Sequence, residues 1–380
     1  MPPRFPPETK DSAARTLVAL TTAHRPQWTP RDYESLAREG FARNAVAYRC
    51  VRMIAEAAAS VPLVVFEGGV RAPEHPLQRL LDRPNPEQGG ADLMEAFFGA
   101  LQTAGNAYLE AAQSDPDAAP DELYALRPDR MKVIPGPRGW PEAYEYAVAG
   151  RSVRLAREAD GWLPVLHLKL FNPTDDHYGF SPLEAAAFAI DVHNASGAWN
   201  KALLDNAARP SGALVYASKE SADRLTEEQF ERLKAELSEA HTGAQAAGRP
   251  LLLEGGLDWR PMSLSPADMD FIEGKHAAAR EIALAFGVPP QLLGVPGDNT
   301  YANFKEANGA FWRHTVVPLA ERAARALTGW LGAKFPGAKV ALDLDAVPAL
   351  FAERDALWAR LEAASFLTPQ ERRRLAGVEG

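Results

Sequence analysis

The sequence predicts an α+β fold in which two long helices carry a small separate module. Short strands between Pro and Gly turns fill much of residues 1–180 of the 380-residue chain. Two Ser-Pro starts, at Ser181 and Ser265, each open a long stretch with few helix breakers. Between these stretches the pattern indicates a strand, a helix and two more strands, which form the module.

The mixed first part begins after an N-terminal arm, residues 1–43, whose first 30 residues are rich in Pro and predicted to be flexible. A helix over residues 44–60 follows, because Val46, Cys50 and Ile54 recur at helical spacing. Gly105 is suited to end a second helix. Further elements are predicted as helices over residues 75–81 and 92–104 and strands over residues 61–66, 107–112, 123–126, 131–134, 143–148 and 165–170.

The first long helix opens with Ser181 as N-cap, Pro182 at the first helical position and Glu184 at the third, the pattern of a capping box. With no strong breaker before Pro210, it is expected to run over residues 182–208, about 40 Å. The second long helix, residues 266–286, begins with the same device and ends at Gly287.

The module between these helices covers residues 211–264. It is predicted to contain a strand at 212–217, a helix at 225–240 and strands at 251–254 and 257–263 joined by Gly255-Gly256 as a hairpin turn. Its helix carries Glu227, Glu228 and Glu231 on an acidic face. This face is either simply solvated or a docking surface for a basic partner.

The remaining elements follow a Pro- and Gly-containing loop at residues 288–303. A long helix is expected over residues 301–335, with a kink or break at Pro318. A strand at 339–344 and two helices, 351–364 and 369–375, complete the chain. The cluster Arg372-Arg373-Arg374 is better explained by the helix dipole at a helix end than by nucleic-acid binding.

Composition limits the possible functions. The net charge of −9 argues against a protein that grips nucleic acid through a basic surface. The single cysteine, Cys50, excludes an internal disulfide framework and a Cys-rich zinc site. No signal peptide or run of about 18 apolar residues is found, so we expect a soluble protein made in a cytoplasm and no membrane contact.

Catalytic motifs are largely missing: the chain has no P-loop, Gly-x-Gly-x-x-Gly or His-Glu-x-x-His pattern. Gly179-Phe180-Ser181 begins like a nucleophile elbow, but Leu183 stands where Gly is required. A hydrolase using Ser181 with His167 or His177 remains an alternative.

Two short polar groups are candidate metal sites. Glu273-x-x-His276 matches half of a di-metal helix motif, but the sequence holds no second copy. Asp175-Asp176-His177 has carboxylates but no fuller ligand set. Surface roles are favoured for both, and no metal or cofactor is predicted.

A series of motifs in a fixed order has a more specific meaning. They are Asn44 with Cys50, Ala59-Ser60-Val61-Pro62-Leu63, His75-Pro76-Leu77 with Leu80-Leu81, Pro84-Asn85-Pro86, Gly105-Asn106-Ala107-Tyr108, Leu123-Tyr124-x-Leu126-x-Pro128-Asp129-Arg130, His167-Leu168, Gly179-x-Ser181-Pro182-Leu183, Leu253-Glu254-Gly255-Gly256, Ser265-Pro266-x-Asp268, Glu281-Ile282-Ala283-x-x-Phe286-Gly287-Val288-Pro289-Pro290-x-Leu292-Leu293-Gly294 and Thr300-Tyr301-x-Asn303. Over roughly residues 44–331 the chain resembles the portal proteins of tailed phages, which phage-like gene transfer agents also use.

The resemblance implies a structural protein and not an enzyme. Such portals form a ring, usually of twelve subunits, at one capsid vertex of a virion or phage-like particle assembled in the bacterial cytoplasm. Double-stranded DNA passes through the ring without sequence specificity. The implied partners are a separate large terminase, the head–tail adaptor, the major capsid protein and other copies of the chain.

The resemblance also implies a role for each part of the chain. The parts are a wing (residues 44–181 and 304–345), two stem helices (182–210 and 265–287), a clip (211–264), a tunnel loop (288–303) and a short crown (346–380). The loop tip that would line the channel comprises Leu292, Leu293, Gly294, Val295, Pro296, Gly297, Asp298 and Asn299. The clip face with Glu227, Glu228 and Glu231 would dock partners.

The acidic balance of the chain suits a conduit, because many salt-bridged phosphate contacts would stall a sliding duplex. A ring also joins two different faces of each subunit, so an isolated subunit is expected to expose apolar surface. A capsid or adaptor component without a channel is the other structural alternative.

Overall fold

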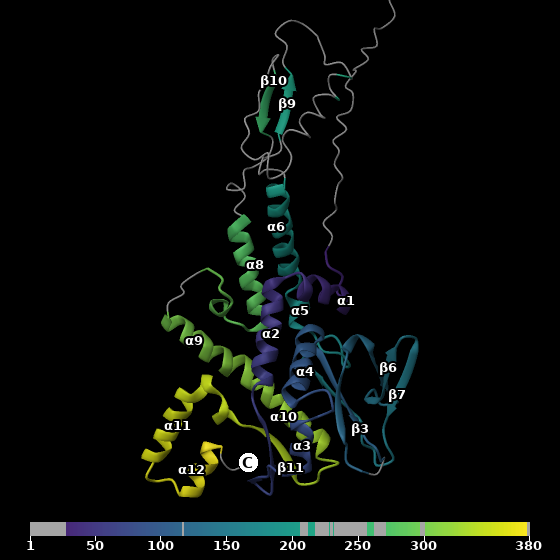
Figure 1. Cartoon of the computed structure of the whole chain (residues 1–380), viewed down its shortest axis with the longest axis vertical. Coiled ribbons are helices and arrows are strands. Elements are labelled where there is room, and N and C mark those ends of the chain that lie inside the picture. Colours follow the sequence, from purple (N-terminus) through teal and green to yellow (C-terminus); the bar gives the residue numbers. More distant parts are fainter. Residues whose placement is uncertain are drawn as a thin grey trace, which may run out of the picture.

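The computed structural model describes residues 28–115, 118–205, 212–216, 228, 231, 257–261, 271–296 and 301–377. Figure 1 shows two helices, α6 and α8, rising side by side from a broad mixed body, with the strand pair β9–β10 beyond the end of α6. The predicted α+β class, with long helices carrying a small module, is confirmed.

The elements of the body come from both ends of the chain. Its helical segments are α1 (Tyr33–Leu36), the π-helical η1 (Ala37–Ala42), α2 (Ala45–Ala59), α3 (Pro76–Asp82), α4 (Gly90–Ala104), the 3₁₀ turn η2 (Pro128–Arg130), α9 (Tyr301–Phe311), the π-helical η5 (Trp312–Val316), α10 (Val317–Leu331) and the 3₁₀ turns η6 (Leu344–Ala346) and η7 (Pro348–Leu350). Its strands are β1 (Leu63–Glu67), β2 (Val70–Arg71), β3 (Asn106–Ala112), β4 (Glu122–Leu126), β5 (Met131–Pro135), β6 (Pro141–Val148), β7 (Arg151–Ala156), β8 (Val165–Lys169) and β11 (Ala338–Leu342).

Helix α2 lies at the centre of the body and packs against α4, α8 and α10. Asn44 caps it, since its side-chain oxygen accepts from the backbone N–H groups of Val46 and Ala47. Cys50 and Ile54 on its inner face are fully buried, as their spacing predicted. The Asn44 side-chain nitrogen also lies 3.0 Å from Asn194 Oδ1 on α6, which joins the long helix to the core.

The sheets of the described body are small and antiparallel. β1 lies between β2 and β11, with Val65 opposite Val340, so it pairs the early part of the chain with residues 338–342. β3 lies between β4 and β8, and β6 between β5 and β7. Strand β7 was missed in the sequence because its residues are almost all exposed and its turn, Ala149-Gly150, lacks the usual Asn-Gly signal.

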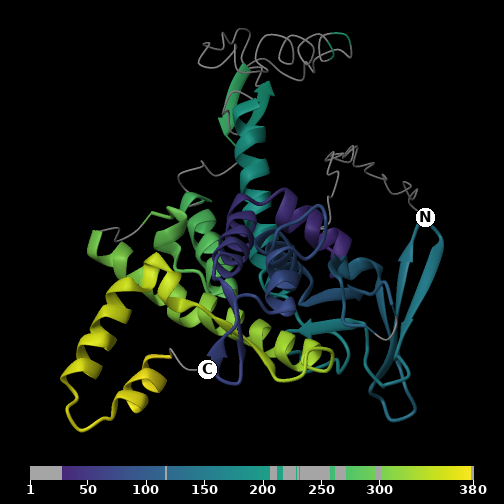
Figure 2. The same cartoon turned by 60° about the horizontal axis from the view of Figure 1, so that its bottom comes forward.

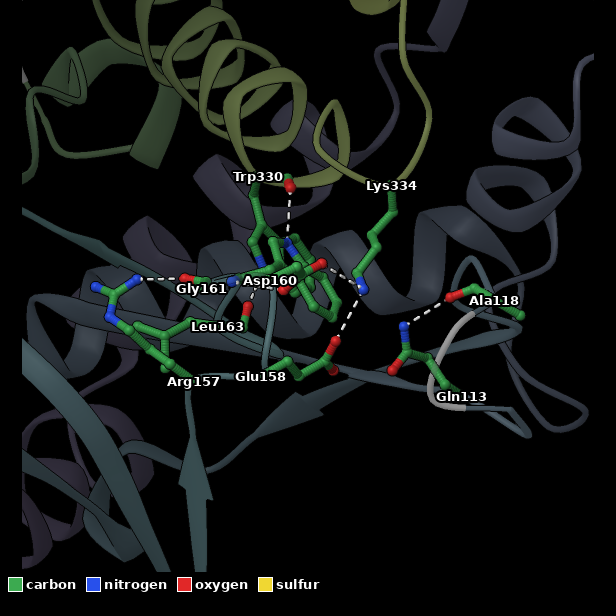
Figure 3. Close-up of polar contacts among 10 residues, drawn as sticks. Gln113, Ala118, Arg157, Glu158, Asp160, Gly161, Leu163, Trp330 and Lys334 are labelled. Atoms are coloured by element: carbon green, nitrogen blue, oxygen red, sulfur yellow. Dashed lines mark hydrogen bonds and ion pairs between the residues drawn. The ribbon is translucent and has the colours of Figure 1, made fainter.

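A buried cluster ties the segment between β7 and β8 to the end of α10 (Figure 3). The indoles of Trp162 and Trp330 stack with centroids 5.9 Å apart, and each donates a hydrogen bond across the contact, to Trp330 O and Leu163 O respectively. Lys334 Nζ lies 2.8 Å from a Glu158 oxygen and 3.0 Å from an Asp160 oxygen. We call Trp162, Trp330, Lys334, Glu158 and Asp160 the tryptophan cluster.

The first of the two long helices differs from its prediction, whereas the second ends where predicted. The first is interrupted: α5 (Pro182–Ala185) ends at Ala186, and α6 (Ala187–Asp205) follows. The local sequence favours a continuous helix, so the break is set by packing, which buries both Leu183 and Ile190. The second is described as α8 (Phe271–Phe286), and its predicted Ser265 start lies outside the described residues.

The helix after residue 300 is broken where Pro318 predicted. A π-helical segment, η5, separates α9 from α10, and Pro318 lies in the first turn of α10. A proline in the first turn costs no hydrogen bond, because those N–H groups have no helical partner. The helix also ends earlier than predicted, at Leu331 rather than Phe335.

The C-terminal hairpin consists of α11 (Phe351–Ala363) and α12 (Pro369–Ala376). Thr368 and Glu371 form a full capping box at the start of α12. In Figure 2 this hairpin projects away from the rest of the body.

The last residues of the segment 1–30, which was predicted to be flexible, make specific contacts with α6. Trp28 stacks on Phe188 of α6 with centroids 5.0 Å apart, and the Thr29 backbone N–H donates to Asp191 at 3.0 Å. From residue 28 onward the chain is therefore held against α6.

Candidate functional site: the loop after α8 and the stalk

The loop after α8 begins with a tightly fixed turn. Gly287 has a left-handed φ of +66°, and its N–H donates to Leu284 O at 3.0 Å. The N–H of Val288 donates to Ala283 O at 2.9 Å, which completes a Schellman motif. The side chain of Val288 is buried. The chain therefore leaves α8 in a set direction, as the Gly-Val-Pro-Pro sequence predicted.

A second contact fixes the same turn from the other side. Thr315 Oγ1, in the π-helical segment η5, donates to Gly287 O at 2.6 Å. A Cβ added at Gly287 would lie only 3.0 Å from that Thr315 oxygen. The π-helical segment and the start of the loop are thus held to each other.

The next residues turn back onto the core. Pro290–Leu293 form a 3₁₀ turn, η4, and Gly294 follows with a φ of +69°. Leu292 and Leu293 are half-buried against the core, and Val295 is buried. These three aliphatic side chains thus pack inward, although the sequence placed them in a loop tip.

A positive charge that sequence reasoning missed also touches this loop. Arg280 lies on the exposed side of α8, and its guanidinium donates to Pro296 O at 2.6 Å. The two residues are sixteen positions apart, so no local pattern could have paired them. Gly297, Asp298 and Asn299 of the predicted tip lie outside the described residues.

The module beyond the stalk is described in part. β9 (Gly212–Tyr216) and β10 (Leu257–Pro261) pair antiparallel, with Leu214 opposite Trp259. Glu228 and Glu231 are helical, in line with the predicted helix. Glu227, the strand at 251–254 and the Gly255-Gly256 turn lie outside the described residues.

The candidate nucleophile Ser181 is occupied as a helix cap. Its side chain is buried, and its hydroxyl accepts from the Glu184 backbone N–H at 2.9 Å. His167 is engaged elsewhere: its Nε2 lies 3.0 Å from Asn106 Oδ1, and its ring stacks on Tyr108. Burial lowers the pKa of His167 to about 3, so it is neutral at physiological pH.

The polar loop at 175–177 is a local turn. Asp175 Oδ1 accepts from the backbone N–H groups of His177 and Tyr178, and these bonds lower the pKa of its carboxyl. Within the described ranges, no three His, Cys, Asp or Glu side chains gather as a metal site would require. None of the helices described has the length and apolar character needed to cross a bilayer.

Comparison with known proteins identifies the family. The family model described as "Phage portal protein" matches residues 45–377. The chain belongs to the phage portal protein family. Among curated relatives, a "Probable portal protein" of Streptomyces phage phiC31 is 29% identical over 72% of this chain and 61% of its own length. An "Uncharacterized protein" of Rickettsia bellii is 44% identical, covering 90% of this chain and 88% of its own.

Solved structures with the same fold are also known. A chain in the neck of an empty gene transfer agent (GTA) particle, computed with C6 symmetry, is 55% identical with a TM-score of 0.72, covering 93% of this chain and 95% of its own. An HK97-family phage portal protein from Corynebacterium diphtheriae is 16% identical with a TM-score of 0.58, covering 85% and 99%. At that identity the second match supports the fold alone.

Proposed function

We propose that this chain is the portal subunit of a phage-like particle and that its copies close into a ring around a DNA channel. The observation that carries the proposal is the 55% identity, over 93% of the chain, to a component of a GTA particle neck. A related neck was solved with C12 symmetry, which favours a ring of twelve. The ring would sit at one capsid vertex and contact the major capsid protein.

Each part of the fold takes a role in this proposal. α6 and α8 form the stem, the module with β9 and β10 forms the clip, and the body forms the wing. The C-terminal hairpin is a short crown. The clip would dock a separate large terminase during packaging and the head–tail adaptor afterwards.

The channel collar is assigned to the end of the loop after α8. Because Leu292 and Leu293 pack against the core and Val295 is buried, the residues left to approach DNA are Pro296 to Asn299 of the sequence. Arg280 holds the start of this segment through the Pro296 carbonyl. A collar of three or four small residues would touch a duplex sterically, with Asp298 keeping phosphate from adhering.

In the proposed function the chain does no covalent chemistry. Ser181 caps a helix and His167 is bonded to Asn106, so the hydrolase alternative has no assembled nucleophile and base within the described residues. Energy for packaging would come from the terminase.

Imaging of assembled particles tests the ring. Particles from a strain that carries this chain with an added affinity tag should show one tagged vertex with an axial hole about 20 Å wide or more, enough for a B-form duplex. Tag density at every vertex would contradict the portal assignment and favour a capsid component.

A loop exchange tests the collar without disturbing the ring. Replacing residues 297–299 with Gly-Ser-Gly should leave ring formation intact and lower the yield of DNA-filled particles. The same exchange at residues 137–139, in the turn between β5 and β6, is the matched control and should have no effect. Normal DNA filling in the 297–299 variant would remove the collar assignment only.

A charge reversal tests the clip. Changing Glu227, Glu228 and Glu231 to Lys should weaken binding of terminase or adaptor, most strongly at low salt. The matched control reverses Glu67 and Glu74, which are exposed on the body. Unchanged partner affinity at low salt would exclude this face.

A further inference from the structure

The side chains of the C-terminal hairpin are not buried by the rest of the described chain. None of its described side chains between residues 351 and 377 is buried. Its two helices share only a thin contact, in which Leu357 and Leu361 of α11 are half-buried. Hydrogen bonds from Arg372 to Ala364 O, at 2.9 Å, and from Arg354 to Ala376 O, at 2.7 Å, brace the hairpin.

The outer face of α11 is apolar and acidic. Phe351, Asp355, Trp358 and Glu362 follow one another at spacings of four, three and four residues, so they lie on one side of the helix. Phe351 is 48% exposed and Trp358 51% exposed. The carboxylates of Asp355 and Glu362 make no hydrogen bond or ion pair within the described part of the chain. At about 100° per residue, this side lies about a third of a turn around α11 from the one that carries Leu357 and Leu361.

The turn and α12 of the hairpin expose apolar and basic side chains. Phe366, in the turn, is 84% exposed, and Leu375 of α12 is 52% exposed. Arg373 and Arg374 precede Leu375 and are exposed, about 200° and 100° away from it around α12. Neither forms an ion pair among the described residues, although Arg374 adds to the lowering of the pKa of Glu371 that hydrogen bonds from Thr368 cause. The hairpin thus exposes large apolar side chains on both helices and in its turn, with carboxylates on the outer face of α11 and guanidiniums on α12.

We propose that the outer face of α11 in one copy binds the turn and α12 of the next copy. The inference rests on the proposed ring, in which every contact joins two different faces of the chain and repeats until the ring closes. A contact of this kind pairs Asp355 and Glu362 with Arg373 and Arg374 of the neighbour. It also covers Phe351 and Trp358, which the chain itself leaves exposed.

The projecting position of the hairpin in Figure 2 allows this contact, because the body of the same copy does not enclose it. Aromatic side chains and arginines are enriched in protein interfaces, and complementary charges around them favour one arrangement of the two faces. In the proposed contact, apolar side chains of two neighbouring hairpins become buried against each other.

Charge exchange tests the contact. Asp355→Arg with Glu362→Arg should lower the fraction of chain in rings at least tenfold in native mass spectrometry at micromolar concentration. Arg373→Glu with Arg374→Glu should do the same, and the fourfold variant should restore assembly to within about threefold of wild type. Arg360→Glu, on a different side of α11, is the matched control and should assemble normally.

Crosslinking decides the geometry directly. Copies with Trp358→Cys are mixed with copies with Leu375→Cys and oxidised; the natural Cys50 is buried. A disulfide between these two kinds of copy supports the contact. Wild-type rings that form while neither the disulfide nor the charge rescue appears would overturn it and leave the portal function standing. Tagged particles without a single-vertex ring would overturn both proposals.

Discussion

Two regions of the molecule contain tryptophans beside charged side chains, and they differ in what covers them. In the tryptophan cluster, Trp162 and Trp330 are 7% and 8% exposed, because residues 158–163 and the end of α10 close over each other. In the C-terminal hairpin, Trp358 is 51% exposed. The first region is completed by distant parts of one chain. The second has the same kinds of residues, but no other part of the described chain packs over them.

The comparison suggests that the tryptophan cluster holds one subunit together, whereas the hairpin holds neighbouring subunits together. The tryptophan cluster joins residues about 170 positions apart through hydrogen bonds, stacking and ion pairs. A subunit that must stay whole while it is part of a ring benefits from such an internal connection. The hairpin keeps its apolar side chains for another surface. Substitutions in the two regions should therefore affect different measurements.

The largest expected effect is on the cluster. Trp330→Ala should lower the free energy of unfolding of the subunit by about 3–5 kcal/mol, because it leaves a cavity and unpairs Leu163 O. Chemical denaturation followed by circular dichroism measures it. Trp140→Ala, at a site 78% exposed, is the control. A loss below about 1 kcal/mol for Trp330→Ala would mean that the cluster does not hold the body together.

The next effect depends on pH. Hydrogen bonds from the Trp162 backbone and from Lys334 lower the pKa of Asp160, and the Glu158 carboxylate raises the pKa of Lys334. A carboxyl with a lowered pKa stabilises the fold above its unfolded pKa of about 3.9 and loses that contribution as the pH falls. The raised pKa of the Lys334 amine stabilises the fold below its unfolded pKa of about 10.4, and this stabilisation is lost at higher pH.

Lys334→Met should therefore destabilise the subunit at neutral pH, by less than Trp330→Ala does. The difference from wild type should shrink as the pH falls through the carboxyl titrations. Thermal unfolding at pH 7 and near pH 3 compares the two proteins. An equal difference at both pH values would show that Lys334 acts through packing over the Trp162 ring, which lies 4.8 Å from its Nζ, and not through its charge.

A smaller effect is expected at the N-cap of α5, outside both regions. Ser181→Ala removes the acceptor for the Glu184 N–H and should cost about 1 kcal/mol of unfolding free energy. Ser181→Asp, which can also cap, is the control and should recover most of it. If the alanine variant abolished a hydrolytic activity while its stability was unchanged, the capping explanation would be wrong.

The smallest effect is expected in the hairpin of an isolated subunit. Trp358→Ala should change the unfolding free energy by no more than about 0.5 kcal/mol, because the side chain is half exposed and away from the core. The same variant should nevertheless reduce ring assembly. A large loss of subunit stability would show that the hairpin is an integral part of the body.

Local patterns in the sequence predicted many of the elements. Helix α2 follows from the periodic burial of Cys50 and Ile54, and α4 ends at Gly105 in a left-handed conformation. The break near Pro318 follows from the geometry of proline. The portal family followed from the order of many short motifs. These features depend on residues close together in the chain, so the sequence contains their causes.

Features that join distant residues could not be predicted in the same way. The break of the long helix at Ala186 has no local signal and arises from packing of Leu183 and Ile190. Leu292 and Val295 were expected at a loop tip, but the core has room for them and burial of apolar surface is favourable. Arg280 reaches Pro296 only because α8 and the loop run back past each other.

The sequence by itself therefore determined the fold class, several helix ends and the family, because capping residues, prolines and glycines act on their immediate neighbours. The tertiary structure decided which side chains are covered. Trp330 and Trp358 look alike in the sequence, each within a predicted helix and with a charged residue no more than four positions away. Only the folded chain brings Trp162 onto the first and leaves the second exposed, because burial depends on residues that meet in space after long separation along the chain.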